Sequence, residues 1–263
     1  MNRKKKSGEV LGKVSGKVSD NVPSKIYIVL MAVFALVFIG AALGLFHSIH
    51  GYREGDNFYQ ELYQDKTEIA QSGSEMPTVD FQALQAVNSD VTAWLYQAGT
   101  GINYPVVQGR DNDYYLNHLL NGDKNKYGTP FIDYRTIDVF HTSMTIIYGH
   151  NMKNGAIFAS LTEYKSQSYY DAHPTMTLLT PNGNYTLEIF SGFVTDGNSD
   201  FYQREFSGDE DFLQYVANVT ANSDFQSSVT VDATDAIVML STCAYDFDEA
   251  RYILFARLTP MVQ

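Results

Sequence analysis

The sequence contains one cysteine, Cys243, and its position suits a reactive thiol. The apolar run 236–240 precedes it and predicts a buried strand, which Ser241 and Thr242 extend. A thiol at the end of such a strand is held by a rigid element and is still open to solvent. The alternative interpretation is a small apolar residue buried in the core, because cysteine is among the most buried residue types. The groups predicted beside Cys243 decide between the two.

A basic residue is predicted to lie beside this thiol. After Cys243 comes a polar loop, residues 244–250, and then Arg251 opens the apolar run 252–256. If the two runs form a hairpin, Arg251 returns next to Cys243. A cation there favours the thiolate and stabilises a developing oxyanion. An arginine at the start of a strand is also often a solvated edge charge, so spacing alone leaves that interpretation open.

A histidine has the same kind of placement. His150 follows the run 145–148 and Gly149, and a glycine lets the backbone turn there without a Cβ clash. A thiol, an imidazole and a guanidinium at strand ends are the groups that thiol-based acyl transfer needs. The thiol attacks a carbonyl, the imidazole moves a proton, and the guanidinium stabilises the oxyanion.

The elements that must position these residues are predicted to be mostly strands. From Trp94 onward, short β-branched and aromatic runs alternate with Gly, Asn, Asp and Pro clusters, which is typical of a β-sandwich or barrel. The clearest runs are residues 102–107, 129–132, 144–148, 176–180, 185–194, 229–231, 236–242 and 252–258. Apolar spacing predicts helices over residues 80–87, 112–120 and 209–218, and Asp80 can cap the first of them.

Charged residues are unevenly distributed along the chain. The net charge is −12, but residues 1–25 hold seven bases and two acids, while the rest holds 11 bases and 28 acids. Between them, residues 26–46 carry no charge over 21 residues. As a helix this run spans roughly 31 Å, the thickness of a bilayer's hydrocarbon core. A cleaved signal peptide has a shorter apolar core of about 7–15 residues, so an uncleaved anchor is favoured.

The basic flank precedes the apolar run. We therefore expect a cytoplasmic N-terminal tail (residues 1–25), a single transmembrane anchor (residues 26–46) and an acidic extracellular body at the cell membrane. Residues 47–75 are predicted to form a juxtamembrane helix, over residues 47–71, and a linker with a break at residues 72–74. Residues 76–263 form one predicted catalytic domain.

Several classes are excluded or disfavoured. One cysteine excludes an intramolecular disulfide and a Cys-rich zinc site, and the net charge of −12 argues against nucleic-acid binding. The acidic clusters at residues 209–211 and 246–249 lack EF-hand spacing and are predicted to be solvated surface charge. No phosphate loop, zinc-protease pair or dinucleotide fingerprint occurs. The sequence therefore predicts no metal and no cofactor.

The residues around the candidate site resemble a known family. Residues 240–243, Leu-Ser-Thr-Cys, with Arg251 eight positions later and residues 148–152, Tyr-Gly-His-Asn-Met, upstream, are similar to the sortase transpeptidases. The resemblance runs in order from about residue 79 to 258. The stretches most like class B sortases are residues 90–95, 102–108, 111–116, 128–135 and 155–158. Met239 departs from the family pattern, which has Thr there, and we expect this to affect packing more than chemistry.

The resemblance implies a fold and an activity. The fold is an eight-stranded sortase β-barrel with N-terminal helices and a helix between the sixth and seventh strands, for which residues 209–218 are the candidate. The reaction cuts a sorting motif near the C-terminus of a secreted protein, after its threonine. A thioester with Cys243 is then resolved by an amine from a peptidoglycan cross-bridge or a pilin lysine.

The resemblance also assigns roles to residues. His150 becomes the acid/base, and Arg251 orients and stabilises the acyl carbonyl. Arg257 is a second candidate, but it lies about 20 Å farther along an extended strand, so Arg251 is preferred. Four further residues are implied to shape or line the substrate groove: Ser241, Thr242, Asn112 and Leu116.

Two other functions stay open at this point. One is an exported cysteine peptidase that acts on cell-wall peptides, although papain-like and cell-wall peptidases usually place Cys before His, opposite to His150 and Cys243. The other is a membrane-tethered surface module without catalysis, in which Cys243 is merely buried. The sequence does not identify the sorting motif, the acceptor amine, or whether the product is an anchored protein or a pilus.

Overall fold

The computed structural model describes residues 24–69 and 76–261. The chain divides into two compact units, Met1–His47 and Ser48–Gln263. Helix α1 (Ser24–Lys66) begins in the first unit and continues into the second without interruption. By length and composition it can cross a membrane, with a mean hydropathy of 2.8 in its most apolar window and none of that window buried.

The juxtamembrane prediction needs correction at its end. Residues 47–66 are helical as predicted, but they continue α1 rather than form a separate helix, and Thr67–Ile69 form the short strand β1. Strand β1 pairs antiparallel with β2 (Pro77–Val79) in a two-stranded sheet. The predicted break at residues 72–74 lies outside the described residues.

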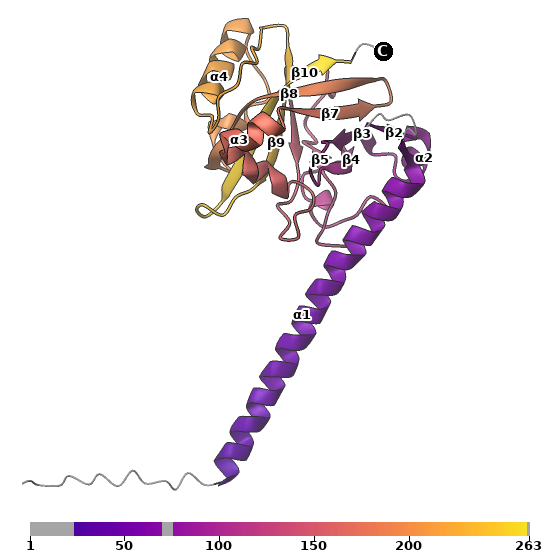
Figure 1. Cartoon of the computed structure of the whole chain (residues 1–263), viewed down its shortest axis with the longest axis vertical. Coiled ribbons are helices and arrows are strands. Elements are labelled where there is room, and N and C mark those ends of the chain that lie inside the picture. Colours follow the sequence, from indigo (N-terminus) through magenta and orange to yellow (C-terminus); the bar gives the residue numbers. More distant parts are fainter. Residues whose placement is uncertain (1–23, 70–75, 262–263) are drawn as a thin grey trace, which may run out of the picture. The chain divides into compact units, whose positions relative to one another are not determined.

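The second unit is built on a closed barrel of eight strands, in the order β10-β8-β7-β3-β4-β5-β6-β9 (Figure 1). This confirms the predicted mainly-β barrel. The strands are β3 (Val91–Tyr96), β4 (Asn103–Val107), β5 (Phe131–Ile132), β6 (Met144–Tyr148), β7 (Thr175–Thr180), β8 (Gly183–Asp196), β9 (Ala236–Cys243) and β10 (Ala250–Pro260).

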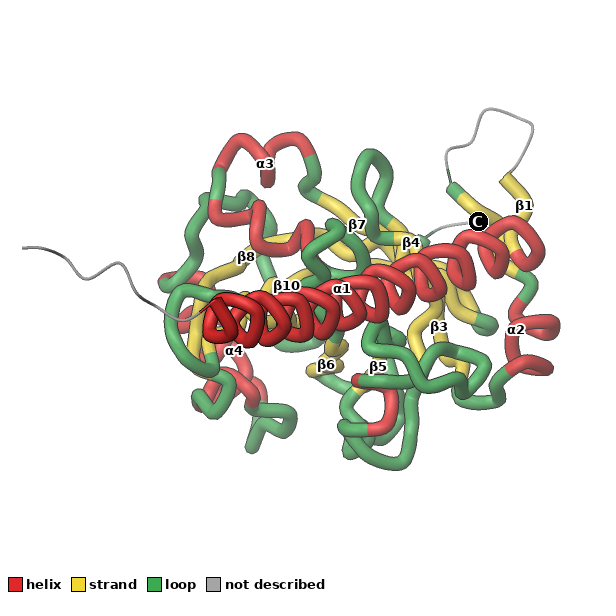
Figure 2. Tube along the Cα trace, turned by 90° about the horizontal axis from the view of Figure 1, so that it is seen from below, coloured by secondary structure: helices red, strands yellow, loops and turns green. Residues whose placement is uncertain are grey.

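Helices and long loops fill the connections, as the red and green segments of Figure 2 show. Helix α2 (Phe81–Val87) is capped as predicted, with the Asp80 carboxylate accepting from the Ala83 backbone nitrogen at 2.9 Å. Helix α4 (Asp209–Ala221) lies between β8 and β9, the sixth and seventh barrel strands, where the resemblance implied it. The remaining short helices are η1 (Tyr114–Leu116), η2 (Ala159–Lys165), α3 (Gln167–Ala172) and η3 (Asp200–Tyr202).

Two predicted elements were wrong, and one strand was not predicted. The helix expected over residues 112–120 shrinks to the single turn η1, because the segment pairs its backbone with residues 123–129 instead of with itself. Residues 229–231 form no strand. Strand β3 was not among the predicted runs; its Ala93, Trp94 and Leu95 are all fully buried, so it lacks the alternation that marks a half-exposed strand.

The core lies on both faces of β9 and β10. Side chains of a strand alternate, so Val238 and Leu240 join the main barrel core while Ile237 and Met239 join a second cluster with the buried face of α4. This double burial explains the unbroken apolar run before Cys243. Met239, where the chain departs from the family pattern, is fully buried in this second cluster.

Candidate active site

Strand pairing brings the three predicted catalytic residues to one edge of the barrel. Strands β6 and β9 are parallel and pair Tyr148 with Ser241, so His150 and Cys243 both stand two residues beyond that pair. Strands β9 and β10 are antiparallel and pair Arg251 directly with Cys243. The predicted hairpin and the shared edge are therefore both present, and all three residues line one open pocket of about 670 Å³.

Cys243 is partly exposed and unbonded to any other sulfur. Its backbone carbonyl accepts a hydrogen bond of 2.9 Å from the side-chain amide of Asn151, which follows His150. This bond ties the end of β9 to the end of β6. The thiol therefore has a fixed backbone on its strand and an open path to solvent through the pocket.

The imidazole of His150 is held by a main-chain oxygen. Its Nε2 lies 2.6 Å from the carbonyl oxygen of Leu116. A carbonyl oxygen can only accept, so Nε2 carries the hydrogen, and Nδ1 of the neutral ring keeps its lone pair for proton exchange. The loop before the histidine is equally tight, because a Cβ on Gly149 would stand 2.5 Å from the Phe158 ring.

The acceptor of this bond is fixed by Gly128. Gly128 has a φ of +66°, and a Cβ there would be 2.6 Å from the Tyr115 carbonyl oxygen and 3.0 Å from that of Leu116. It would also be 3.2 Å from Cδ2 of His150. Only glycine fits this close approach of three segments.

Arg251 is positioned from within its own loop. Its guanidinium donates 3.0 Å hydrogen bonds to the Glu249 carboxylate and to the Ala250 carbonyl, and 29% of the side chain is exposed. Arg257, the second candidate, instead binds Glu188 at 2.7 Å and pairs with Ile237, six positions away from Cys243 along β9. Only Arg251 of the two lines the pocket.

The four predicted groove residues all line the same pocket. Ser241 and Thr242 are nearly buried, and their hydroxyls are engaged: Ser241 Oγ lies 2.8 Å from the Tyr202 hydroxyl, and Thr242 donates to the Gly149 carbonyl at 2.7 Å. Thr242 therefore holds the loop that carries the histidine. Leu116 presents an exposed side chain, while its carbonyl holds His150.

Asn112 belongs to a polar wall of the pocket. It donates at 3.2 Å to the carboxylate of Asp133, which is fully buried and receives two bonds from the Arg135 guanidinium, at 2.8 and 2.6 Å. The Tyr148 hydroxyl donates to the same carboxylate at 3.2 Å. Burial raises the pKa of Asp133, but the bonds from Arg135 and Asn112 outweigh it and lower the pKa to about 2. The carboxylate is thus charged and anchors the wall.

Comparison with known proteins identifies the family of this chain. The sortase domain family model matches residues 98–259. Sortase B of Listeria monocytogenes is 38% identical over 181 residues, which cover 68% of this chain and 74% of that protein. The chain belongs to the sortase family. It is a cysteine transpeptidase of the class B type by these relatives.

Solved structures of class B sortases are similar to this chain. The crystal structure of sortase B from B. anthracis in complex with AAEK1 has a TM-score of 0.70 at 31% identity and covers 81% of this chain and 100% of that one. A sortase B complexed with triglycine has a TM-score of 0.66 at 31% identity, with coverage of 69% and 86%.

Sequence reasoning missed several residues that line the pocket of this sortase or support its wall. Tyr202 reaches the pocket from η3, a single turn that no periodicity reveals. Asp133 and Arg135 had a signal, because opposite charges two residues apart directly after an apolar run can form an ion pair at a strand end. The acidic loop after Cys243 is also partly paired, since Asp246 binds Lys165 at 2.7 Å. Within residues 24–69 and 76–261, no cluster of three or more His, Cys, Asp or Glu side chains could hold a metal ion.

Proposed function

We propose that this sortase is a membrane-anchored enzyme that cleaves a C-terminal sorting motif of secreted proteins and transfers the acyl group to an amine. The observation that carries this proposal is the strand register that puts His150, Cys243 and Arg251 around one pocket. The residue roles follow from the chemistry of these three groups, and no further cofactor enters the reaction.

In the first half of the reaction, Nδ1 of His150 takes the Sγ proton and the thiolate attacks the carbonyl carbon of the motif's threonine. The guanidinium of Arg251 stabilises the tetrahedral oxyanion. The C–N bond then breaks, the imidazolium returns its proton to the leaving amine, and a thioester with Cys243 remains.

In the second half, an acceptor amine attacks the thioester carbonyl and gives its proton to His150. The C–S bond breaks, a new amide bond forms, and the thiol is restored. We propose an amine of a peptidoglycan cross-bridge or a pilin as the acceptor. A similar sortase B has been solved in complex with triglycine, which supports a small amine-bearing peptide.

The location follows from charge and hydropathy. The uncharged run 26–46 would be a single-pass anchor with the basic tail, residues 1–25, in the cytoplasm. Residues 76–263, the catalytic domain, would then face outward, with residues 47–75 between them. Enzyme and exported substrate would meet at the outer face of one membrane.

The test uses the full chain in detergent micelles with a library of sorting-motif peptides. Intact-protein mass spectrometry should find an adduct equal to the peptide's N-terminal fragment less one water, and added amine should convert it to a new peptide. Cys243→Ala should abolish the adduct and lower turnover by about a thousandfold or more. Absence of any adduct, while a thiol reagent still labels Cys243, would refute the proposal; release by water alone would favour a peptidase.

A further inference from the structure

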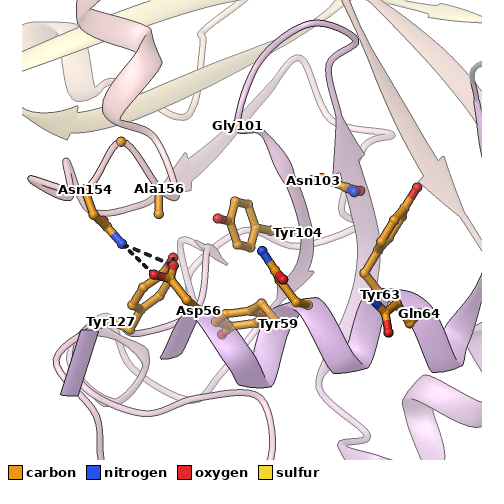
Figure 3. Close-up of a pocket in the computed structure, with 12 residues that line it drawn as sticks. Asp56, Tyr59, Tyr63, Gln64, Gly101, Asn103, Tyr104, Tyr127, Asn154 and Ala156 are labelled. Atoms are coloured by element: carbon orange, nitrogen blue, oxygen red, sulfur yellow. Dashed lines mark hydrogen bonds between the residues drawn. The ribbon is translucent and has the colours of Figure 1, made fainter. Parts of the chain in front are cut away.

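A second pocket, away from Cys243, lies where α1 meets the barrel. It has a volume of about 380 Å³ and is lined by Asp56 and Tyr59 of α1, by Tyr104 and Tyr127, and by the loop 154–156 (Figure 3). Tyr59 is buried to 4% exposure and its ring packs edge-on against that of Tyr104. The side chains of Asp56, Tyr127 and Asn154 bind one another at one end of this pocket, which suggests a brace rather than a ligand site.

The first contact of this brace runs through Tyr59. Its hydroxyl donates to the carbonyl oxygen of Gly128 at 2.7 Å and lies 2.7 Å from Thr129 Oγ1. Gly128 is the residue that abuts both the Leu116 carbonyl and the imidazole of His150. Tyr59 therefore fixes the backbone on which the histidine's hydrogen-bond acceptor rests.

The second contact runs through Asp56, one helical turn earlier. Its carboxylate accepts from the Tyr127 hydroxyl and from the side-chain amide of Asn154, the latter at 3.1 and 3.2 Å (Figure 3). Tyr127 immediately precedes Gly128, and Asn154 lies four residues after His150. One side chain of α1 thus holds the segment before the glycine and the loop after the histidine.

Both tyrosines act as neutral donors. Burial raises the pKa of Tyr59 and of Tyr127 well above the ordinary value, and for Tyr127 the neighbouring Tyr104 and the Asp56 carboxylate raise it further. The hydroxyl protons therefore stay in place across the range in which an imidazole titrates. Titration of the tyrosines does not interrupt the brace within that range.

We propose that Tyr59 and Asp56 are positioning residues for His150, so that the part of α1 beyond the membrane run is a working component of the active site. This rests on the proposed function of His150. Tyr59 keeps Gly128 against the Leu116 carbonyl, which holds Nε2 and leaves Nδ1 for the thiol. Asp56 steadies the two segments that flank this arrangement.

The main test compares Tyr59→Phe, which removes only a hydroxyl, with Gln60→Ala, an exposed neighbour in the same pocket. The full chain in micelles is assayed for acyl transfer and, with ¹⁵N-labelled histidine, for the His150 tautomer, assigned with His150→Gln. Tyr59→Phe should lower kcat about tenfold with KM within twofold, and should mix the Nδ1 and Nε2 tautomers. Gln60→Ala should change neither quantity.

A charge swap tests Asp56. Asp56→Asn and Asn154→Asp should each lower kcat about threefold or more, the latter because two carboxylates then face each other. The double variant restores one donor facing one acceptor and should regain most of the rate. If the brace had only a structural role, the single variants would lower the melting temperature but leave the His150 tautomer unchanged. The rate would then not depend on the charge swap of the double variant.

The outcomes separate the two proposals. If the unaltered chain forms no acyl adduct, the proposed function fails, while the tautomer measurement still reports on the brace. If the unaltered chain is active and Tyr59→Phe keeps both kcat and the Nε2–H tautomer, the positioning role is refuted. If the double variant stays as slow as the single variants, the positioning role of Asp56 is refuted.

Discussion

The two halves of the active site are held in different ways. Cys243 and Arg251 sit on adjacent strands, and the pairing of β9 with β10 places them opposite each other. His150 stands past the end of β6, and its ring is held by the Leu116 carbonyl, where a Cβ on Gly128 would crowd both groups. The thiol and the cation thus depend on ladder register, whereas the base depends on close packing between loops that are distant in sequence.

This difference teaches where the site is vulnerable. A strand register is shared among many hydrogen bonds, so one altered side chain leaves it in place. A close approach of three loop segments depends on single residues, because nothing else supplies the missing space or bond. Substitutions in the loops should therefore reduce catalysis more than equally buried substitutions in the strands.

Apart from loss of the thiol itself, the largest effect is expected for Gly128→Ala. The new Cβ would lie 2.6 Å from a backbone oxygen at a φ of +66°, so the loop must shift and move the Leu116 carbonyl away from His150. We expect kcat to fall about a hundredfold and stability to fall by about 2 kcal/mol. Acyl-transfer kinetics and urea unfolding measure both. Gly183→Ala is the control for the rate, because its φ of +159° also strains an alanine while a Cβ there meets nothing. An equal loss of kcat in the two variants would contradict a role for close packing around His150.

A smaller effect is expected for Arg251→Lys. Lysine keeps the charge but lacks the planar guanidinium that binds both Glu249 and the Ala250 carbonyl. The charge should therefore be held less firmly beside the thiol. We expect kcat/KM to fall about tenfold. Arg257→Lys should keep kcat/KM within twofold, because Arg257 binds Glu188 and does not line the pocket. The opposite ranking would assign the oxyanion role to Arg257.

Asp133→Asn should alter stability more than rate. Asp133 has a folded pKa of about 2, below its ordinary value, so its bonds stabilise the fold above pH 4 and that stability disappears as the pH falls toward 2. The variant should lose about 2 kcal/mol at neutral pH. Its urea midpoint should approach that of the unaltered enzyme near pH 2, and kcat/KM should fall only about threefold. The exposed Asp248→Asn is the control. If stability falls at low pH in Asp133→Asn just as it does in the unaltered enzyme, Asp133 does not cause that loss of stability.

The smallest catalytic effect is expected for Met239→Thr, which restores the family's residue inside β9. Met239 packs fully buried under α4, so the shorter polar side chain should cost about 2 kcal/mol of stability. The register that places Cys243 should survive, with kcat/KM within twofold. A tenfold change in kcat/KM would mean that the strand half of the site is as sensitive as the loop half.

The same division explains what could be predicted from the sequence. The run before Cys243 and the Arg251 hairpin were predictable because strand periodicity is local, and the barrel followed from the number of such runs and from the resemblance to sortases. The acceptor of His150 was not predictable, because Leu116 and His150 are 34 residues apart and meet through a carbonyl that any residue carries. Tyr202 and the bracing tyrosine Tyr59 were missed for the same reason, because their hydroxyls bind residues that are distant in the sequence.

The parallel pairing of β6 with β9 has a consequence for the life of the chain before it folds. Its partners are about ninety residues apart, and long-range parallel pairing of this kind forms late. Until β6 and β9 pair, the cysteine has no imidazole beside it, whereas Arg251 reaches it through the local hairpin of β9 and β10. The thiol and its base therefore meet only when the barrel closes, so a chain in transit has no imidazole placed to help the thiol attack the carbonyls that it meets on the way.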